Sequence, residues 1–265
     1  MNFPLQQIYQ TIDSKRDLYN QIAAKTHKVE DDNAAQIISS ELENYLIRLE
    51  KYWSNPQAHK NGEPTLTVAQ GVNIFLEVIQ SGLSFSEIAN HIYLSRLKGT
   101  GTAVGYQITA DGLVYLAIKA GAIDHLSEPT IVQTGEQFAI MSTPDGKQFA
   151  QHNMIFDGKP PFSFNQFLVG YVYIVYPNGD RELSWISNTR LAKYKAKSLN
   201  QSMYNDESFI QTKIIKHALR KVRKTPFMQK MLAEDDEIIQ ENRIWEDNPA
   251  TYDERETYNN TVEPF

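Results

Sequence analysis

Residues 166–198 read QFLVGYVYIVYPNGDRELSWISNTRLAKYKAKS, and this stretch decides the fold class. The apolar run 167–176 has the length of a strand, and 181–186 can return beside it. The Asn178–Gly179 pair in the connecting turn accepts the positive φ angles that tight hairpins require. A lysine-rich helix is predicted directly after this hairpin. The pattern therefore predicts an α+β fold, in which a small antiparallel sheet and hairpins are surrounded by helices.

The rest of the chain supplies the other elements of such a fold. Helical spacing of apolar residues predicts helices over 33–53, 68–81, 113–120 and 208–223, a short helix over 5–12 and a helical turn over 84–88. Alternating runs predict strands over 92–97, 104–108, 124–132, 137–141 and 148–156. We divide the chain into an N-terminal segment that could contact other subunits, a core and an acidic flexible tail, at 1–32, 33–233 and 234–265.

The composition favours a soluble, cytoplasmic protein. The 265 residues include no cysteine, which excludes disulfides, thiolate metal sites and cysteine nucleophiles. No apolar run approaches the roughly 20 residues that a membrane helix needs. Residues 1–17 contain neither a basic n-region nor an apolar h-region, so we expect no secretion.

Charge is distributed unevenly along the chain. Residues 234–265 hold eleven acidic residues against Arg243 and Arg255, a net charge of −9, so residues 1–233 carry +3. Residues 188–230 alone hold eleven basic residues and two acidic ones. This division predicts a surface that binds a polyanion and a separate interaction tail. The alternative is a solvated helix face followed by a disordered terminus.

Other candidate chemistry is weaker. The turn Lys98–Thr102 is rich in glycine, but it joins two predicted strands and lacks the phosphate-loop pattern. The six histidines show no metal-binding spacing. Asp145, Asp157 and the acidic cluster 234–237 could serve a metal-dependent nuclease, which is the main alternative function. A sequence-specific DNA binder or scaffold that uses the 208–224 helix is a third alternative.

The basic segment offers a better site. Single-stranded nucleic acids are held by cationic surfaces interleaved with aromatic rings on which bases stack. Tyr194, Tyr204, Phe209 and Phe227 lie among the lysines and arginines of 188–230. Phe209 and Phe227 also fit a core role, which leaves Tyr194 and Tyr204 as the open stacking candidates.

Three segments resemble the RecT/Beta-type phage single-strand DNA annealing proteins. The first runs from Gly82-Leu83-Ser84 through HIYLSRL and GYQI to ADGLVYLAIKAG. In the second, ELSWISNTRLAKYKAKS, Trp185 precedes a basic helix. The third, FIQTKIIKHALRKVRKTPFMQKMLAEDDE, is similar to the closing helix of the family, in which a lysine and an arginine lie seven apart, here Lys213 and Arg220. The order agrees from about residue 34 to 240, although the GYKG of the family is GYQI here.

The resemblance implies ATP-independent binding of single-stranded DNA and annealing of complementary strands in homologous recombination and repair. No bond is made, so the protein is a recombinase only in the loose sense, with no catalytic residue and no cofactor beyond a conceivable Mg²⁺ dependence. By matching positions, the expected DNA-binding residues are Arg96, Lys98, Tyr106, Lys119, Arg190, Lys193, Lys195, Lys213, Lys216 and Arg220.

The resemblance also implies partners. Family members form ring or helical-filament homo-oligomers around single strands and the annealed duplex intermediate, and they work with an exonuclease in a bacterial cell, encoded by a phage or prophage. No membrane partner is expected. The terminal Glu263-Pro264-Phe265 resembles the docking peptide of bacterial single-strand binding proteins. Alternatively, the acidic tail folds back over the basic surface, or it only solubilises the chain.

Overall fold

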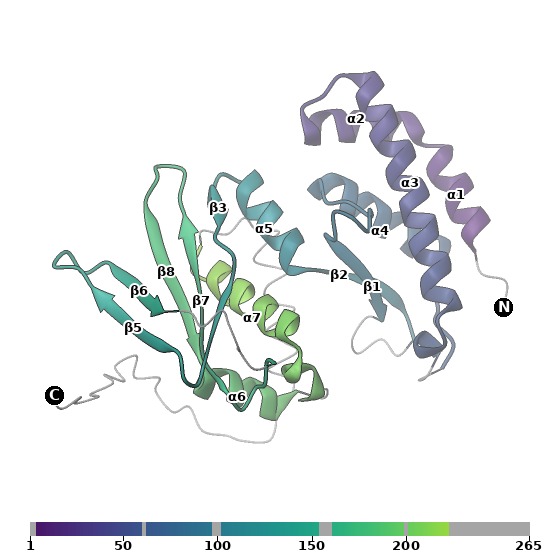
Figure 1. Cartoon of the computed structure of the whole chain (residues 1–265). Helices are drawn as coiled ribbons and strands as arrows, with labels where there is room; N and C mark the ends of the chain where they lie inside the picture. The colour runs from purple at the N-terminus through teal and green to yellow at the C-terminus, as the bar shows by residue number, and fades with distance from the viewer. Residues whose placement is uncertain (1–3, 60–61, 97–101, 154–160, 199–200, 223–265) are drawn as a thin grey trace, which may run out of the picture.

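The computed structural model of the chain describes residues 4–59, 62–96, 102–153, 161–198 and 201–222. Helices gather around small antiparallel sheets, so the predicted α+β class is confirmed (Figure 1). Within the described residues, no helix is both long enough and apolar enough to span a bilayer.

Four helices form the N-terminal part: α1 (Leu5–Asp13), α2 (Arg16–His27), α3 (Asp31–Ser54) and α4 (Val68–Ser81). A short 3-10 turn, η1 (Pro56–His59), follows α3. Helix α2 was not predicted, because Tyr19 and Ala23 are its only buried residues and make too narrow an apolar stripe. The Tyr19 ring packs edge-on against Phe75 of α4, at 5.3 Å between ring centroids. Helices α1 and α2 therefore contribute side chains to the same core as α3 and α4.

The segment after α4 differs from the prediction. Residues 84–88 were predicted to form a helical turn, but 83–86 have no regular secondary structure and the turn lies at 87–90. The cause lies in α3. Glu41 accepts hydrogen bonds from the Ser84 hydroxyl and the Phe85 amide, while Arg48 donates to backbone carbonyls of the same segment. Side chains of α3 thus hold the backbone just before the turn, while the Ser86 carbonyl also accepts a hydrogen bond from the Asn90 amide within the turn.

The predicted first hairpin is present. Strands β1 (Ile92–Arg96) and β2 (Val104–Ile108) pair in antiparallel register, and the predicted turn Lys98–Gly101 lies outside the described residues. Thr109 then caps α5 (Ala110–Lys119) by accepting a hydrogen bond from the Gly112 amide.

The main sheet is built around a central strand. Strand β7 (Phe167–Val175) pairs with β8 (Arg181–Ser187) on one side, and with β3 (His125–Leu126) and β4 (Thr130–Gln133) on the other. A single strand was predicted over 124–132, but Ser127–Pro129 interrupt it and separate β3 from β4. The Ser127 hydroxyl there accepts a hydrogen bond from the Tyr173 amide of β7. Strands β5 (Gln137–Ser142) and β6 (Gln148–Asn153) form a separate hairpin.

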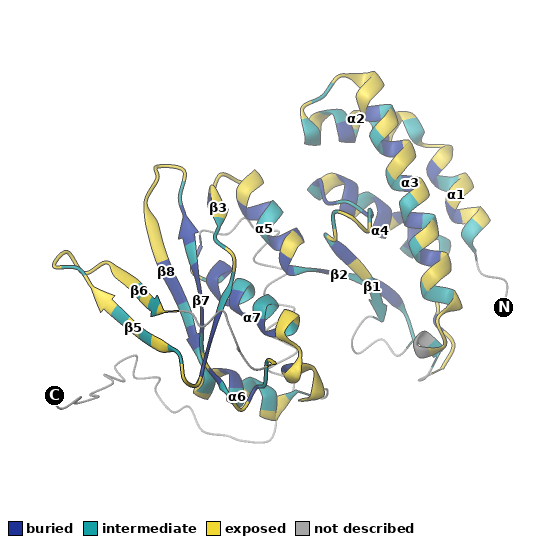
Figure 2. Cartoon of the chain, in the orientation of Figure 1, coloured by how far each residue is buried: buried dark blue, intermediate teal, exposed yellow. Residues whose placement is uncertain are grey.

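Two layers cover the two faces of β7. Helix α7 (Glu207–Leu219) packs on the face that carries Gly170, where a Cβ atom would lie 2.3 Å from Ile214. The β5–β6 hairpin packs on the opposite face, against Tyr171. Helix α6 (Asn188–Lys197) follows β8 directly, and η2 (Gln201–Asn205) joins it to α7. Figure 2 shows the buried β7 between the more exposed hairpin and helices.

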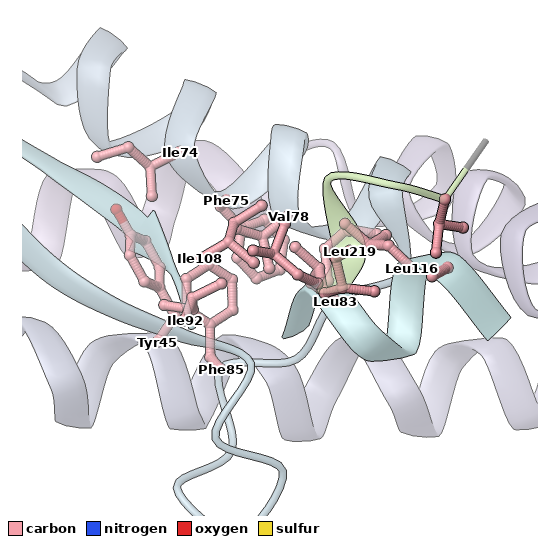
Figure 3. Close-up of a cluster of buried hydrophobic side chains, with 14 of the residues drawn as sticks. Tyr45, Ile74, Phe75, Val78, Leu83, Phe85, Ile92, Ile108, Leu116 and Leu219 are labelled. Carbon is pink, nitrogen blue, oxygen red and sulfur yellow. The ribbon is translucent and has the colours of Figure 1, made fainter. Parts of the chain in front are cut away.

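One hydrophobic core joins the N-terminal helices to the sheet. Figure 3 shows Leu219, from the end of α7, beside Leu83 and Leu116 in the cluster that Phe75 and Val78 of α4 also enter. The last turn of α7 is therefore anchored in the part of the core that α4 and α5 build.

Candidate nucleic-acid interface

Helix α6 presents its cations on a short, capped scaffold. The Ser187 side chain accepts a hydrogen bond from the Arg190 amide, which fixes the start of the helix next to the end of β8. Arg190, Lys193 and Lys197 follow one another at spacings of three and four residues, so they share one side of α6, and all are exposed. Leu191 on another side is fully buried. Packing of Leu191 thus directs the three cations outward.

Helix α7 presents a second row of cations, in addition to the row on α6. Lys213, Lys216 and Arg220 also follow at spacings of three and four residues, so they lie along one side of the helix. A neighbouring side of the helix is buried, and Ile214 on that side packs against the sheet at Gly170. The side chains of the three cations are half-buried, which means that their stems lie on the protein surface.

His217 lies within electrostatic range of cations from both rows. This buried side chain, 8% exposed, lies on α7, and its pKa is lowered to about 4, first by burial and then by the charges of Arg190, Lys221 and Arg220. A hydrogen bond to the Trp185 backbone on β8 opposes the shift. Charges from α6 and from the end of α7 therefore act on one buried imidazole.

Packed aromatic rings lie between Lys195 of α6 and Lys213 of α7. The Lys195 ammonium lies 4.3 Å from the centroid of the Phe164 ring, and the Lys213 ammonium lies 4.8 Å from that of Phe209. Tyr204 packs edge-on against both rings, with centroids 5.7 Å from Phe164 and 5.1 Å from Phe209. The ring chain is continuous, so Lys195 and Lys213 are held at its two ends by cation–π contacts.

The two tyrosine candidates differ in exposure. Tyr204 is only 2% exposed, and burial together with the nearby Tyr194 raises its pKa to about 12. Its faces are covered by the core and do not offer a stacking platform. Tyr194 is half-buried, and its hydroxyl accepts a hydrogen bond from Arg190 Nε at 3.3 Å. Tyr194 is therefore the tyrosine with ring surface beside the cations.

We call this region the α6–α7 surface. It comprises Arg190, Lys193, Tyr194, Lys195, Lys197, Phe209, Lys213, Lys216, Arg220 and Lys221. Eight of these residues are cations, and the acidic residues on the same segment, Asp206 and Glu207, lie at the start of α7. The arrangement combines point charges with flat apolar rings, as a site for a sugar–phosphate chain requires.

The predicted residues of the central region have other partners. Arg96 Nη2 donates a hydrogen bond to the Gly62 carbonyl. The Tyr106 hydroxyl donates to Glu77 on α4, at 3.0 Å. Lys119 Nζ donates to the Ser81 carbonyl at 3.2 Å and so satisfies a terminal carbonyl of α4. These contacts give all three residues structural roles, and their predicted contact with DNA stays a prediction. Lys98 lies outside the described residues.

A pocket of about 410 Å³ adjoins Lys221. Four of its five charged lining residues pair with one another, the fifth being Arg181: Lys221 Nζ lies 3.9 Å from Glu182, and Lys147 Nζ lies 3.4 Å from Asp180. The Tyr176 hydroxyl donates to Glu182 at 2.7 Å. The pKa of Tyr176 is raised to about 12 by burial and by Glu182. This pocket therefore contributes little net charge to the α6–α7 surface.

The nuclease residues are not gathered within the described part of the chain. Asp145 lies exposed in the β5–β6 turn, where hydrogen bonding by the Thr143 hydroxyl lowers its pKa. Among the described residues, no group of three acidic or histidine side chains could hold a metal ion. Asp157 and the cluster 234–237 lie outside the described residues.

Sequence reasoning missed His217 and Phe164. His217 lies within the predicted helix, but nothing in its spacing indicates burial between two rows of cations. Phe164 precedes β7 in a segment predicted only as connection. Lys221 was counted in the basic segment without being chosen as a contact.

Comparisons with known proteins do not assign this chain to a family. A scan against protein-family models matches no family, and a search of curated protein sequences returns no significant match.

Proposed function

We propose that the protein binds single-stranded DNA on the α6–α7 surface and anneals complementary strands without ATP. The observation that carries the proposal is the pair of cation rows on α6 and α7, whose Lys195 and Lys213 lie at the two ends of one chain of packed aromatic rings. Arg190 on α6 and Arg220 and Lys221 at the end of α7 also lie near enough to His217 for their charges to lower its pKa. The resemblance to RecT/Beta-type annealing proteins supports the same reading.

The chemistry that such a surface supplies is charge neutralisation. Two complementary strands repel each other through their phosphates, and lysine and arginine lower this repulsion when they bind the backbone. Contacts to phosphate carry no sequence information, which suits a protein that anneals any complementary pair. The bases remain free to pair, so the protein itself makes and breaks no covalent bond.

The proposal extends to assembly and location. On the same resemblance, we place the protein in the cytoplasm of a bacterial cell, as a phage or prophage product. It would act there as a ring or filament homo-oligomer with a partner exonuclease and the host single-strand binding machinery.

A strand-annealing assay tests the proposal directly. Two complementary fluorescent oligonucleotides are mixed with protein, with and without Mg²⁺, and both annealing and strand length are followed. We expect faster annealing of intact strands, and the double variant R190Q/R220Q should lose this acceleration while Lys15→Gln, an exposed cation at the α1–α2 junction, keeps it. Shortened strands with Mg²⁺ would instead indicate a nuclease. Strong preference among unrelated competitor oligonucleotides would indicate a sequence-specific binder.

A further inference from the structure

Strand β5 has an open edge. Strands β5 and β6 form a two-stranded sheet of their own, and β5 is its outer strand (Figure 1). The Thr143 amide donates to the Lys147 carbonyl at 2.9 Å, which makes the 143–147 pair a hydrogen-bonded one. Since hydrogen-bonded and non-hydrogen-bonded pairs alternate, the backbone groups of Ala139 face β6, and those of Phe138 and Ile140 face away from it.

The two edges of this hairpin differ. On β6, the Ala150 amide points outward and donates to the Tyr173 hydroxyl at 2.8 Å, so this edge faces the main sheet. On β5, the outward amides and carbonyls of Phe138 and Ile140 make no hydrogen bond to any described residue. The β5 edge therefore offers a row of donors and acceptors to a further strand.

This edge also lacks the usual protection. Exposed edges are normally blocked by charged residues or proline, because they otherwise pair with other chains. The sequences of β5 and β6, QFAIMS and QFAQHN, contain no Lys, Arg, Asp, Glu or Pro. Strand β8, which is also an edge, begins with Arg181 and Glu182, and His217 bonds its backbone at Trp185. The protein thus protects β8 and leaves β5 open.

We propose that β5 pairs with β5 of a second copy of this chain, antiparallel and centred on Ala139. Residues that face the same side of a sheet must lie opposite each other, which limits the registers that are allowed. In this one, Phe138 of each copy lies opposite Ile140 of the other and exchanges both backbone hydrogen bonds with it. Aromatic and β-branched residues make favourable cross-strand pairs.

The side chains of β5 suit this register. Ala139 lies on the axis in a non-hydrogen-bonded pair, where the Cα atoms approach to about 4.5 Å and a small side chain fits best. Met141, 44% exposed, would lie opposite Gln137 of the second copy and be partly covered. A register centred on Ile140 would also keep residues of the same face opposite each other. It would place Phe138 of each copy opposite Ser142 of the other, so both Phe138–Ile140 pairs would be lost.

Cysteine crosslinking tests the pairing, because the chain has no cysteine of its own. The predicted Cα separation at Ala139 falls in the range of about 4.4–6.8 Å that a disulfide spans. The full-length Ala139→Cys variant is oxidised mildly and analysed without reductant. The matched control is Gln151→Cys, at the exposed cross-strand partner of Ala139 on the same face of the hairpin.

We expect Ala139→Cys to form covalent dimers at least about ten times faster than Gln151→Cys. A charge exchange checks the register: Ala139→Lys and Ala139→Glu should each raise the dimer dissociation constant about tenfold, and mixing them should restore association, because opposite charges then face each other across the axis. Equal crosslinking at both positions, no crosslinking at Ala139, or no recovery on mixing would overturn the proposal. The test requires no DNA, so it fails or succeeds independently of the proposed function.

Discussion

Lys213 gives the sharpest test of the α6–α7 surface. Its ammonium is held 4.8 Å from the centroid of the Phe209 ring, so the charge has a defined position over a half-buried platform. The change Lys213→Gln removes the charge and keeps a polar side chain of similar length. Because contacts to phosphate do not read bases, we expect the variant to bind every single-stranded sequence more weakly, by a similar factor.

The size of the effect follows from counterion release. For single strands, the logarithm of affinity falls with the logarithm of salt concentration by about 0.7 for each phosphate neutralised. Losing one contact should therefore make this slope shallower by about 0.7. Between 50 and 200 mM salt, the affinity of the variant should then fall by a factor that is about 2.5 times smaller than for the unchanged protein. A lost charge-assisted hydrogen bond at a partly exposed site corresponds to a rise in Kd of about tenfold at low salt.

Fluorescence anisotropy with labelled oligonucleotides of unrelated sequence, at four or more salt concentrations, measures both quantities. Lys15→Gln is the matched control, since it removes one exposed lysine charge at the α1–α2 junction. An unchanged slope for Lys213→Gln, or a slope change equal to that of Lys15→Gln, would refute the assignment of Lys213. A loss confined to one oligonucleotide would refute the reasoning from phosphate contacts.

Four further outcomes are expected. Leu219→Ala should lower the free energy of unfolding by about 2–5 kcal/mol in chemical denaturation, because Leu219 is fully buried and its loss leaves a cavity; a smaller loss would contradict the packing in Figure 3. Gly170→Ala should cost about 1–3 kcal/mol, since the new Cβ would lie 2.3 Å from Ile214, and adding Ile214→Val should recover part of it. The folded-state pKa of His217, about 4, lies below its ordinary 6.5, so the unfolded state binds the proton more readily. The free energy of unfolding should therefore fall by up to about 3 kcal/mol as pH falls from 6.5 to 4. Chemical denaturation at several pH values should show a flatter profile for H217Q. Removing residues 234–265, with their net charge of −9, should leave annealing intact and strengthen DNA binding, and a truncated chain unable to anneal would place the tail in the working core.

The elements that were predicted correctly carry their own local signals. Thr67 begins α4 with a capping box, and Gly82 ends the helix in a left-handed conformation. The 166–186 hairpin likewise depends on its own turn residues. Helix α2 and the 83–90 segment could not be predicted, because α2 is stabilised by packing against α3 and α4 and the segment by side chains of α3.

The candidate site also has features that the sequence could predict and features that it could not. The spacing of Lys213 and Arg220 on one helix side could be predicted, because helical periodicity is local. The approach of Arg190 to that row depends on how β8 directs α6 across the sheet, and only the tertiary structure determines it. The burial of Tyr204 between Phe164 and Phe209 is a contact between separate segments, which the sequence pattern does not contain.

The α6–α7 surface and the β5 edge lie on opposite sides of the main sheet. Successive residues of β7 point to opposite faces: Gly170 lies against Ile214 of α7, and Tyr171 stacks on Phe138 of β5 at 5.6 Å between ring centroids. Two copies joined through β5 would therefore keep both α6–α7 surfaces open, each able to hold one strand. It follows that Ala139→Lys should change self-association while leaving the affinity of the chain for a short single strand unaltered. If this variant also lost affinity, the two surfaces could not be independent.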